Sequence, residues 1–309
     1  MDIRTELHKA QLFQNLELLA NQIVEGFISG IHKSPFHGFS AEFAEHKIYN
    51  PGESTKHVDW KLYAKTDRLY TKRYEDETNL RCHMILDNSA SMYYPKVKQL
   101  SIGKLNKVGF GVLAIAALMQ ILKKQRDAVG LSIYSDSYNF YASEKSSERH
   151  FQMLYSKLKE VSSTKEASQN TKTYTYLHQI AEKIHRRSLI FLFSDMFQTE
   201  TEDRKLFEAL RHLKYNKHAV VLFHLLDREH EIDFDFENVP KRFVDMETGT
   251  HIDLYADNIK KAYYEKMATY QNDLKLKCAQ YQIKYVGVDI ASDFSQIFNT
   301  FMTEQKKFG

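Results

Sequence analysis

From residue 80 to the end of the chain, short apolar runs alternate with longer amphipathic segments. The apolar runs have the length and bounded ends of buried strands, and they cover 80–86, 128–135, 188–195, 218–227 and 283–290. Between them hydrophobic residues recur every three or four positions, which predicts helices over 103–124, 149–161, 174–187, 203–214, 259–280 and 294–306. This alternation is typical of an α/β fold, a mostly parallel sheet with helices on both faces.

The first 79 residues have a different pattern. Helical spacing of leucines predicts an amphipathic helix over 5–29. Turn signals at Ser34-Pro35 and Pro51-Gly52, with short aromatic alternations between them, predict a small β-rich unit. We expect Trp60, the only tryptophan, to anchor this unit against the main sheet. The pattern divides the chain into an N-terminal helix and small unit over 1–79, and an α/β domain over 80–309.

Composition and charge narrow the class of protein. Of the 309 residues, 43% are hydrophobic and 27% charged, as in an ordinary soluble domain, and a net charge of +3 without basic clusters gives no nucleic-acid footprint. Cys82 and Cys278 lie in apolar patterns and are interpreted as buried thiols. The longest apolar run, 111–122, is too short to span a bilayer, and the first residues lack a signal peptide. We expect a cytoplasmic protein without direct membrane insertion.

Candidate chemistry lies where two predicted strands end. The run "MILDNSASMYY" turns from apolar residues to Asp87, Ser89 and Ser91, and "SLIFLFSD" ends at Asp195. A hydroxyl-rich loop, "NTKTYT", opens the helix that precedes the second strand. In open α/β sheets ligands bind beyond the carboxyl ends of the strands, and carboxylate and hydroxyl oxygens are the hard ligands that Mg²⁺ prefers. The segments together predict a divalent-cation site.

Three alternatives stay open for these residues. "DNSAS" also suits a strand-ending turn or a helix N-cap. A Mg²⁺-dependent hydrolase, a phosphatase or a nuclease, could use Asp87 and Asp195. A dehalogenase-type phosphatase, however, would need an acid at position 89, where the chain has Ser89. The third alternative is a degenerate fold that binds no metal.

A second polar cluster follows the strand at 218–227. His224, Asp227, His230, Asp233 and Asp235 lie close together in the sequence "HLLDREHEIDFDFE". Their spacing is not one typical of zinc sites. We interpret the segment as a solvated loop.

The arrangement D-x-S-x-S, a later threonine and a strand-ending S-D resembles the metal-ion-dependent adhesion site of von Willebrand factor A-type domains. The resemblance implies Mg²⁺ or Mn²⁺ as the cofactor and, as its ligands, Asp87, Ser89, Ser91, Thr171 and Asp195. Thr173 and Thr175 are close alternatives to Thr171. It implies a non-enzymatic module in which an Asp or Glu of a protein partner completes the metal shell.

The segment 48–77 resembles the signature of the bacterial family called domain of unknown function 58. The matching residues are Tyr49, Pro51, Gly52, Val58, Asp59, Trp60, Ala64, Lys72, Tyr74 and Glu77. Glu53 replaces an aspartate, and Lys65 lies where arginine is usual, which loses bidentate reach. The resemblance implies a von Willebrand A-like (Rossmann-like) domain over 80–309. It also implies work with a MoxR-type AAA+ ATPase and membrane-anchored von Willebrand A proteins in a chaperone-like or complex-assembly role.

Overall fold

The computed structural model describes two compact units of the chain. The described residues are 15–31, 46–49, 58, 60–72, 80–97, 100–101, 103–135, 138–163, 173–197, 203–246 and 249–308. One unit comprises residues 1–27 with 80–309, and the other comprises residues 28–79. The following statements concern each unit by itself.

The larger unit is built on a six-stranded sheet. Its strands are β3 (Arg81–Asp87), β4 (Ala128–Tyr134), β5 (Tyr138–Lys145), β6 (Leu189–Ser194), β7 (Ala219–Leu226) and β10 (Lys284–Asp289). They lie in the order β10-β7-β6-β3-β4-β5, and every neighbouring pair is parallel except β4 and β5. The predicted fold class, a mostly parallel, Rossmann-like α/β sheet, is confirmed.

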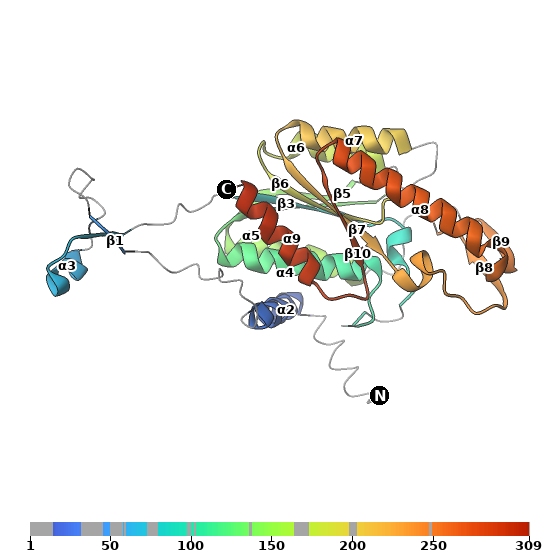
Figure 1. Ribbon diagram of the computed structural model, residues 1–309, viewed down its shortest axis with the longest axis horizontal. Helices are drawn as coiled ribbons and strands as arrows, with labels where there is room; N and C mark the ends of the chain where they lie inside the picture. The colour runs from blue at the N-terminus through green and yellow to red at the C-terminus, as the bar shows by residue number, and fades with distance from the viewer. Residues whose placement is uncertain are drawn as a thin grey trace, which may run out of the picture. The chain divides into compact units, whose positions relative to one another are not determined.

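Helices cover both faces of this sheet (Figure 1). One face packs against α6 (Thr173–Lys183), α7 (Asp203–Tyr215) and the end of α8 (Ala256–Gln280) through a buried apolar cluster. The other face packs against α4 (Lys107–Lys124) and α9 (Ser295–Phe308), with α5 (Glu148–Ser163) beside α4. Strands buried on both faces explain why their sequences are nearly unbroken apolar runs. The predicted buried, unpaired thiols Cys82 and Cys278 are confirmed.

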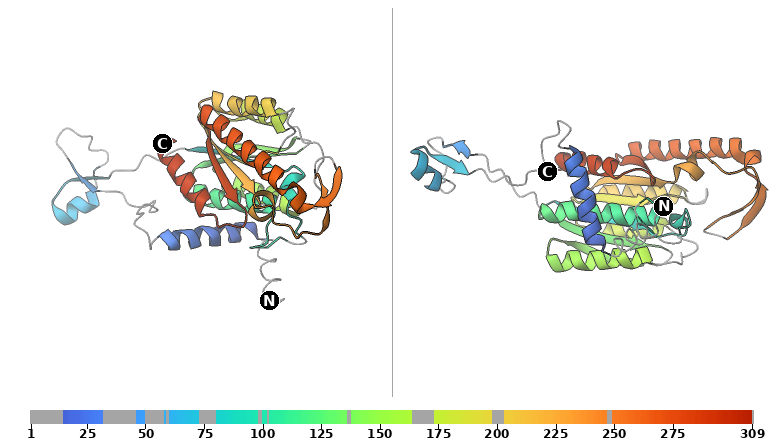
Figure 2. Two further views of the ribbon diagram at one scale, coloured as in Figure 1. Left: turned by 45° about the vertical axis from the view of Figure 1, so that its right-hand side comes forward. Right: turned by 90° about the horizontal axis from the view of Figure 1, so that it is seen from below.

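The N-terminal helix α2 (Leu16–Ile31) packs on the larger unit. Glu17 accepts a hydrogen bond from Lys123 at 2.8 Å, and Asn21 accepts one from Gln120 at 3.1 Å. The sequence pattern groups this helix with the small unit, whereas these contacts join it to α4. Its apolar residues Leu16, Leu19, Ala20 and Val24 are buried, and Figure 2 shows the helix running beside the α/β unit.

Helix α4 begins four residues later than its hydrophobic spacing predicts. Gly103 has a φ of +89°, which breaks the helical path, and the side chain of Asn106 accepts a hydrogen bond from the Gly109 amide at 2.8 Å. Asn106 is therefore the N-cap, and Lys107 is the first helical residue. Within the described part of the chain, no helix, α4 included, has both the length and the apolar character needed to cross a bilayer.

The small unit contains β1 (His46–Ile48), antiparallel to β2 (Tyr70–Lys72), and α3 (Trp60–Thr66). The Trp60 side chain is 60% exposed, and its ring meets Tyr63 edge-on with 6.2 Å between centroids. Within the small unit Trp60 is therefore not buried, and its predicted packing against the main sheet stays a prediction.

Candidate functional site

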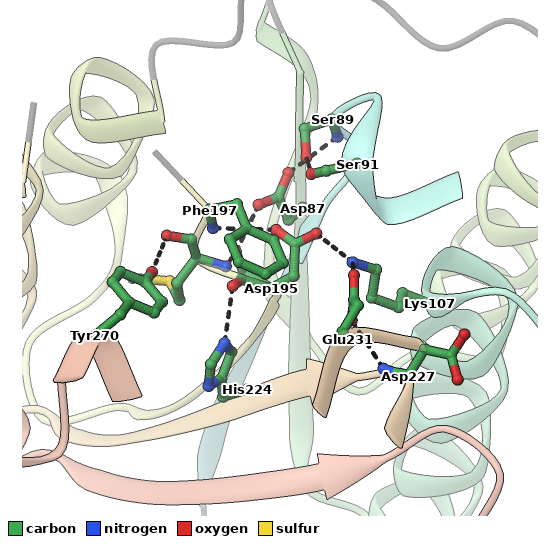
Figure 3. Close-up of polar contacts among 12 residues, drawn as sticks. Asp87, Ser89, Ser91, Lys107, Asp195, Phe197, His224, Asp227, Glu231 and Tyr270 are labelled. Atoms are coloured by element: carbon green, nitrogen blue, oxygen red, sulfur yellow. Dashed lines mark hydrogen bonds and ion pairs between the residues drawn. The ribbon is translucent and has the colours of Figure 1, made fainter. Parts of the chain in front are cut away.

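The predicted acids meet at the point where the strand order reverses. From β3 the chain proceeds to β4 and β5 on one side, and from β6 it proceeds to β7 and β10 on the other. Such a switch point, at the carboxyl ends of the strands, is where open α/β sheets bind ligands. Asp87 ends β3, Asp195 follows β6, and their side chains are 2% and 1% exposed. The structure thus brings both carboxylates to one buried place (Figure 3).

Asp87 is held by hydrogen bonds on both of its carboxylate oxygens. Oδ1 accepts from the Ser89 amide at 2.9 Å, and Oδ2 accepts from the Ser194 hydroxyl at 2.5 Å. Burial, and then the charge of Asp195, raise the pKa of Asp87 to about 7. A cation placed beside two neighbouring buried acids stabilises their ionised forms.

Ser89 and Ser91 turn toward each other beside Asp87. Their hydroxyl oxygens lie 3.2 Å apart, and Ser91 opens a short 3₁₀ turn that ends at Tyr93. Oxygens at right angles around Mg²⁺, each about 2.0–2.1 Å from the ion, are about 2.9 Å apart. The two hydroxyls are therefore spaced nearly as adjacent ligands of an octahedral ion.

The predicted threonine ligand remains a prediction. Thr171 lies outside the described residues, and α6 begins at Thr173. Nothing in the described geometry chooses between Thr171, Thr173 and Thr175.

A lysine that the sequence analysis missed, Lys107, lies between Asp195 and another acid, Glu231. Lys107 is fully buried, with Nζ 2.7 Å from Asp195 Oδ2 and 2.6 Å from Glu231 Oε1. Burial works to lower the pKa of Lys107, but the charges of Asp195 and Glu231 outweigh it and raise that pKa above its ordinary value. The ammonium is therefore charged. One signal was present in the sequence: Lys107 heads a helix that is otherwise apolar as far as residue 119.

The segment after β7 is a solvated loop only in part. Arg228, Glu229, Asp233 and Asp235 are exposed, but Arg228–Ile232 form a π-helical turn, and the side chain of Glu231 is only 13% exposed. Glu231 Oε2 accepts a hydrogen bond from the Asp227 amide at 2.8 Å, and Asp227 itself is only 6% exposed. Asp227 in turn accepts from His230 at 2.8 Å. Glu231 pairs with Lys107, and this contact holds the turn against the larger unit. The spacing of acids and histidines along the segment does not predict this contact.

The backbone after Asp195 is held in an uncommon conformation. Met196 has a φ of +55°, which costs a non-glycine residue about 1–2 kcal/mol. Its amide donates to the Ser194 hydroxyl at 2.9 Å, and its carbonyl accepts from Tyr270. His224 Nε2 lies 2.8 Å from the Asp195 carbonyl, which can only accept, so His224 donates there. These contacts fix the direction of the Asp195 side chain.

Another buried polar cluster lies on β3, nearer the amino end of this strand than Asp87. His83 Nε2 is 2.7 Å from the Ser132 hydroxyl, and His83 Nδ1 is 2.6 Å from Glu144 Oε1. Glu144 Oε2 also accepts from His185 at 2.8 Å. The order Ser–His–acid is that of hydrolytic triads, but Ser132 and His83 are both 0% exposed. Neither can meet a substrate, so this cluster is structural.

The donor set suits a hard divalent cation, with one departure. It offers the carboxylates of Asp87 and Asp195 and the hydroxyls of Ser89 and Ser91. Among the described residues, no three His, Cys, Asp or Glu side chains are grouped so that they could hold a metal ion by themselves, so a cation here would depend on the hydroxyls. The departure is Asp195, whose Oδ2 already pairs with Lys107.

These features define a class of protein, an α/β domain with an acid-rich buried cluster at the switch point of its sheet. The chain belongs to the family described as "Protein of unknown function DUF58", whose model matches residues 45–273.

Known proteins similar to this chain add little about function. An 83-residue segment is 28% identical to uncharacterised proteins of Mycobacterium bovis and Mycobacterium tuberculosis, and it covers 27% of this chain and 26% of each relative. The chain thus matches about a quarter of the length of these curated relatives.

Two solved structures resemble the fold distantly. The conserved hypothetical protein BatB from Bacteroides thetaiotaomicron has a TM-score of 0.46 at 16% identity, over 74% of this chain and 98% of that one. An aerotolerance-related membrane protein from Bacteroides fragilis has a TM-score of 0.40 at 14% identity, over 73% and 99%. At these values the resemblances carry no functional information.

Proposed function

We propose that the protein is a non-enzymatic module that binds a protein partner through a divalent cation, Mg²⁺ or Mn²⁺. Asp87, Ser89, Ser91 and Asp195 would hold the ion, with Thr171, Thr173 or Thr175 as a further ligand. A carboxylate of the partner would complete its shell, because an anion gains more from the cation than water does.

One observation carries this proposal: two buried carboxylates and two converging hydroxyls share the switch point of the sheet. Asp87 and Asp195 are nearly inaccessible, yet the hydroxyls of Ser89 and Ser91 lie 3.2 Å apart beside them. Burying two acids side by side is costly unless a cation compensates them. Neutral hydroxyls would leave the ion electron-poor and able to take one more anionic ligand.

The same contacts favour binding over hydrolysis. Both oxygens of Asp87 accept hydrogen bonds, and Asp195 Oδ2 is paired with Lys107 while Oδ1 accepts from the Phe197 amide at 3.2 Å. Position 89, where a dehalogenase-type phosphatase needs a second acid, is Ser89, whose hydroxyl faces the Ser91 hydroxyl. Phosphatase and nuclease assays with Mg²⁺ should accordingly give no turnover.

The family resemblance supplies the candidate partner. We propose that the module works in the cytoplasm with a MoxR-type AAA+ ATPase and with membrane-anchored von Willebrand A proteins, in a chaperone-like or complex-assembly role. The partner surface would carry the Asp or Glu that reaches the metal.

The test is capture of the purified ATPase by the immobilised full chain, in Mg²⁺ and in chelator. We expect capture in Mg²⁺ only, and loss of capture in the Ser89→Ala/Ser91→Ala variant. The matched control is Ser162→Ala/Ser163→Ala on α5, whose hydroxyls bond only to the exposed Lys159 carbonyl. Equal capture by the site variant in chelator would refute the proposed contact.

A further inference from the structure

Two cations would compete for one carboxylate of the site, that of Asp195. Asp195 is a proposed ligand of the cation, and its Oδ2 already lies 2.7 Å from the ammonium of Lys107. The contact is fully buried, since the side chains of Lys107 and Asp195 are 0% and 1% exposed. The other oxygen, Oδ1, accepts from the Phe197 amide. A metal ion on Oδ2 would therefore have to share that oxygen with the Lys107 ammonium or displace it.

Lys107 has a second partner that does not belong to the proposed ligand set. Glu231 Oε1 lies 2.6 Å from Nζ, and the side chain of Glu231 is 13% exposed. The turn Arg228–Ile232 that carries Glu231 is tied to α8, because Tyr263 donates to the Glu231 carbonyl at 2.9 Å. Glu231 can thus keep the lysine paired when Asp195 turns to another cation (Figure 3).

The charges of the cluster make this exchange possible. When ionised, Asp87, Asp195 and Glu231 supply three negative charges against the single positive charge of Lys107. A divalent ion beside Asp87 and Asp195 would balance the remainder, leaving Lys107 and Glu231 as a neutral pair. The ammonium and the metal ion nevertheless repel each other across a site of low dielectric.

We propose that Lys107 is an internal cation that competes with the divalent metal for Asp195 and so sets the metal affinity of the site. Without metal, Lys107 holds Asp195. With metal, Lys107 remains on Glu231 and yields Asp195. This inference rests on the metal site of the proposed function and adds the residue that determines its affinity.

The test is titration of the full chain with Mn²⁺, with free ion measured by electron paramagnetic resonance at fixed pH and ionic strength. Lys107→Met keeps an unbranched side chain that is one atom shorter and removes the charge, so we expect Mn²⁺ to bind at least tenfold more tightly than in the wild type. Glu231→Gln leaves Asp195 as the only acid of Lys107, so we expect at least threefold weaker binding.

The matched control is Lys123→Met. Lys123 lies on the same helix, about 24 Å further along, and it also bridges two acids, Glu17 and Glu148. The change in net charge equals that of Lys107→Met, so a general electrostatic effect would appear in both variants. We expect wild-type affinity in the control.

A second variant protects the test against misfolding. Lys107→Met/Glu231→Gln removes one acid together with the lysine, so fewer unpaired charges are buried, and we expect it to bind Mn²⁺ as tightly as Lys107→Met. Affinity within twofold of the wild type in both Lys107 variants, or weaker, overturns the inference while the proposed function stands. Tight binding by these variants alone, with none by the wild type, supports the inference and refutes the proposed function. No binding by any of them refutes both.

Discussion

Strand β3 carries two buried polar side chains on one face, His83 nearer its amino end and Asp87 at its carboxyl end. Around His83, each polar atom has a partner within the chain: Ser132 on one ring nitrogen and Glu144 on the other. Around Asp87, two further acids, Asp195 and Glu231, share Lys107, and the hydroxyls of Ser89 and Ser91 face each other. The first cluster is complete, whereas the second has an excess of negative charge. The difference teaches that burial of polar groups marks a candidate site only where their charges do not balance.

The substitution Lys107→Met, measured in chelator, is expected to change the free energy of unfolding most and tests the difference between the two clusters most strongly. Removing one partner of a buried ion pair leaves unpaired acids and costs about 3–5 kcal/mol. We expect a loss of this size in the free energy of unfolding, measured by urea titration. In Lys123→Met, where the pairs are partly exposed, the loss should stay below about 1 kcal/mol. Equal losses in the two variants would contradict a special role for the buried pair.

Adding Mg²⁺ to the wild type should act on the carboxyl-end cluster alone. An ion that binds only the native state stabilises it by about 2.7 kcal/mol at a concentration 100-fold above its Kd. We expect a rise in melting temperature with millimolar Mg²⁺, which Asp87→Ala abolishes. His83→Leu should lower the melting temperature yet keep the Mg²⁺-dependent rise, because His83 lies about 13 Å from Asp87 along the strand. The same melting temperature in metal and in chelator would count against the site.

Gly130→Ala should disturb the complete cluster instead. An added Cβ would lie 2.4 Å from His83 Nδ1 and 2.9 Å from the Ala142 carbonyl, so His83 must shift away from Glu144. Overpacking of this kind costs about 1–3 kcal/mol, and we expect that loss in urea unfolding with or without Mg²⁺. The control is Gly26→Ala in α2, where an added Cβ meets nothing within 4 Å and helix propensity favours alanine. A loss that depends on Mg²⁺ would show that the two clusters are coupled.

The smallest expected effect is a pH dependence from Glu144. Burial raises the pKa of Glu144, but the hydrogen bond and charge of His83 outweigh it and hold that pKa below the ordinary value of 4.5. The unfolded chain therefore takes up the proton first as the pH falls, so the stabilisation is complete above pH 4.5 and disappears as the pH falls through the native pKa. Glu144→Gln should flatten this acid limb of stability, whereas Glu160→Gln, an exposed acid on α5, should not. An unchanged acid limb in Glu144→Gln would contradict this assignment.

The sheet could be predicted from the sequence because its strands are short apolar runs. Residues 188–195 and 218–227 are buried on both faces, and such runs leave little choice of structure. The same reasoning predicted that Asp87 and Asp195 lie at strand ends, and the strand order places those two ends side by side. The strands and the positions of the two acids could thus be predicted from short stretches of sequence.

The partners of these acids were not encoded locally. Lys107 meets Asp195 and Glu231 across 88 and 124 residues, and no spacing along the chain predicts those contacts. Hydrophobic periodicity also began α4 too early, at 103, which hid the position of Lys107 at its start.

The long separation within the Lys107 cluster has a consequence in time. The chain is synthesised from its N-terminus at about 5–20 residues per second, so Glu231 follows Lys107 from the ribosome after about 6–25 s. Asp195 follows Lys107 by 88 residues and emerges earlier, after about 4–18 s. Until Asp195 emerges, α4 carries at its start an ammonium that has neither of its acids, and β3 lacks its neighbour β6. The proposed metal site, which needs both Asp87 and Asp195, would be complete only after β6 has joined the sheet. Metal binding there would therefore report that the centre of the domain has folded.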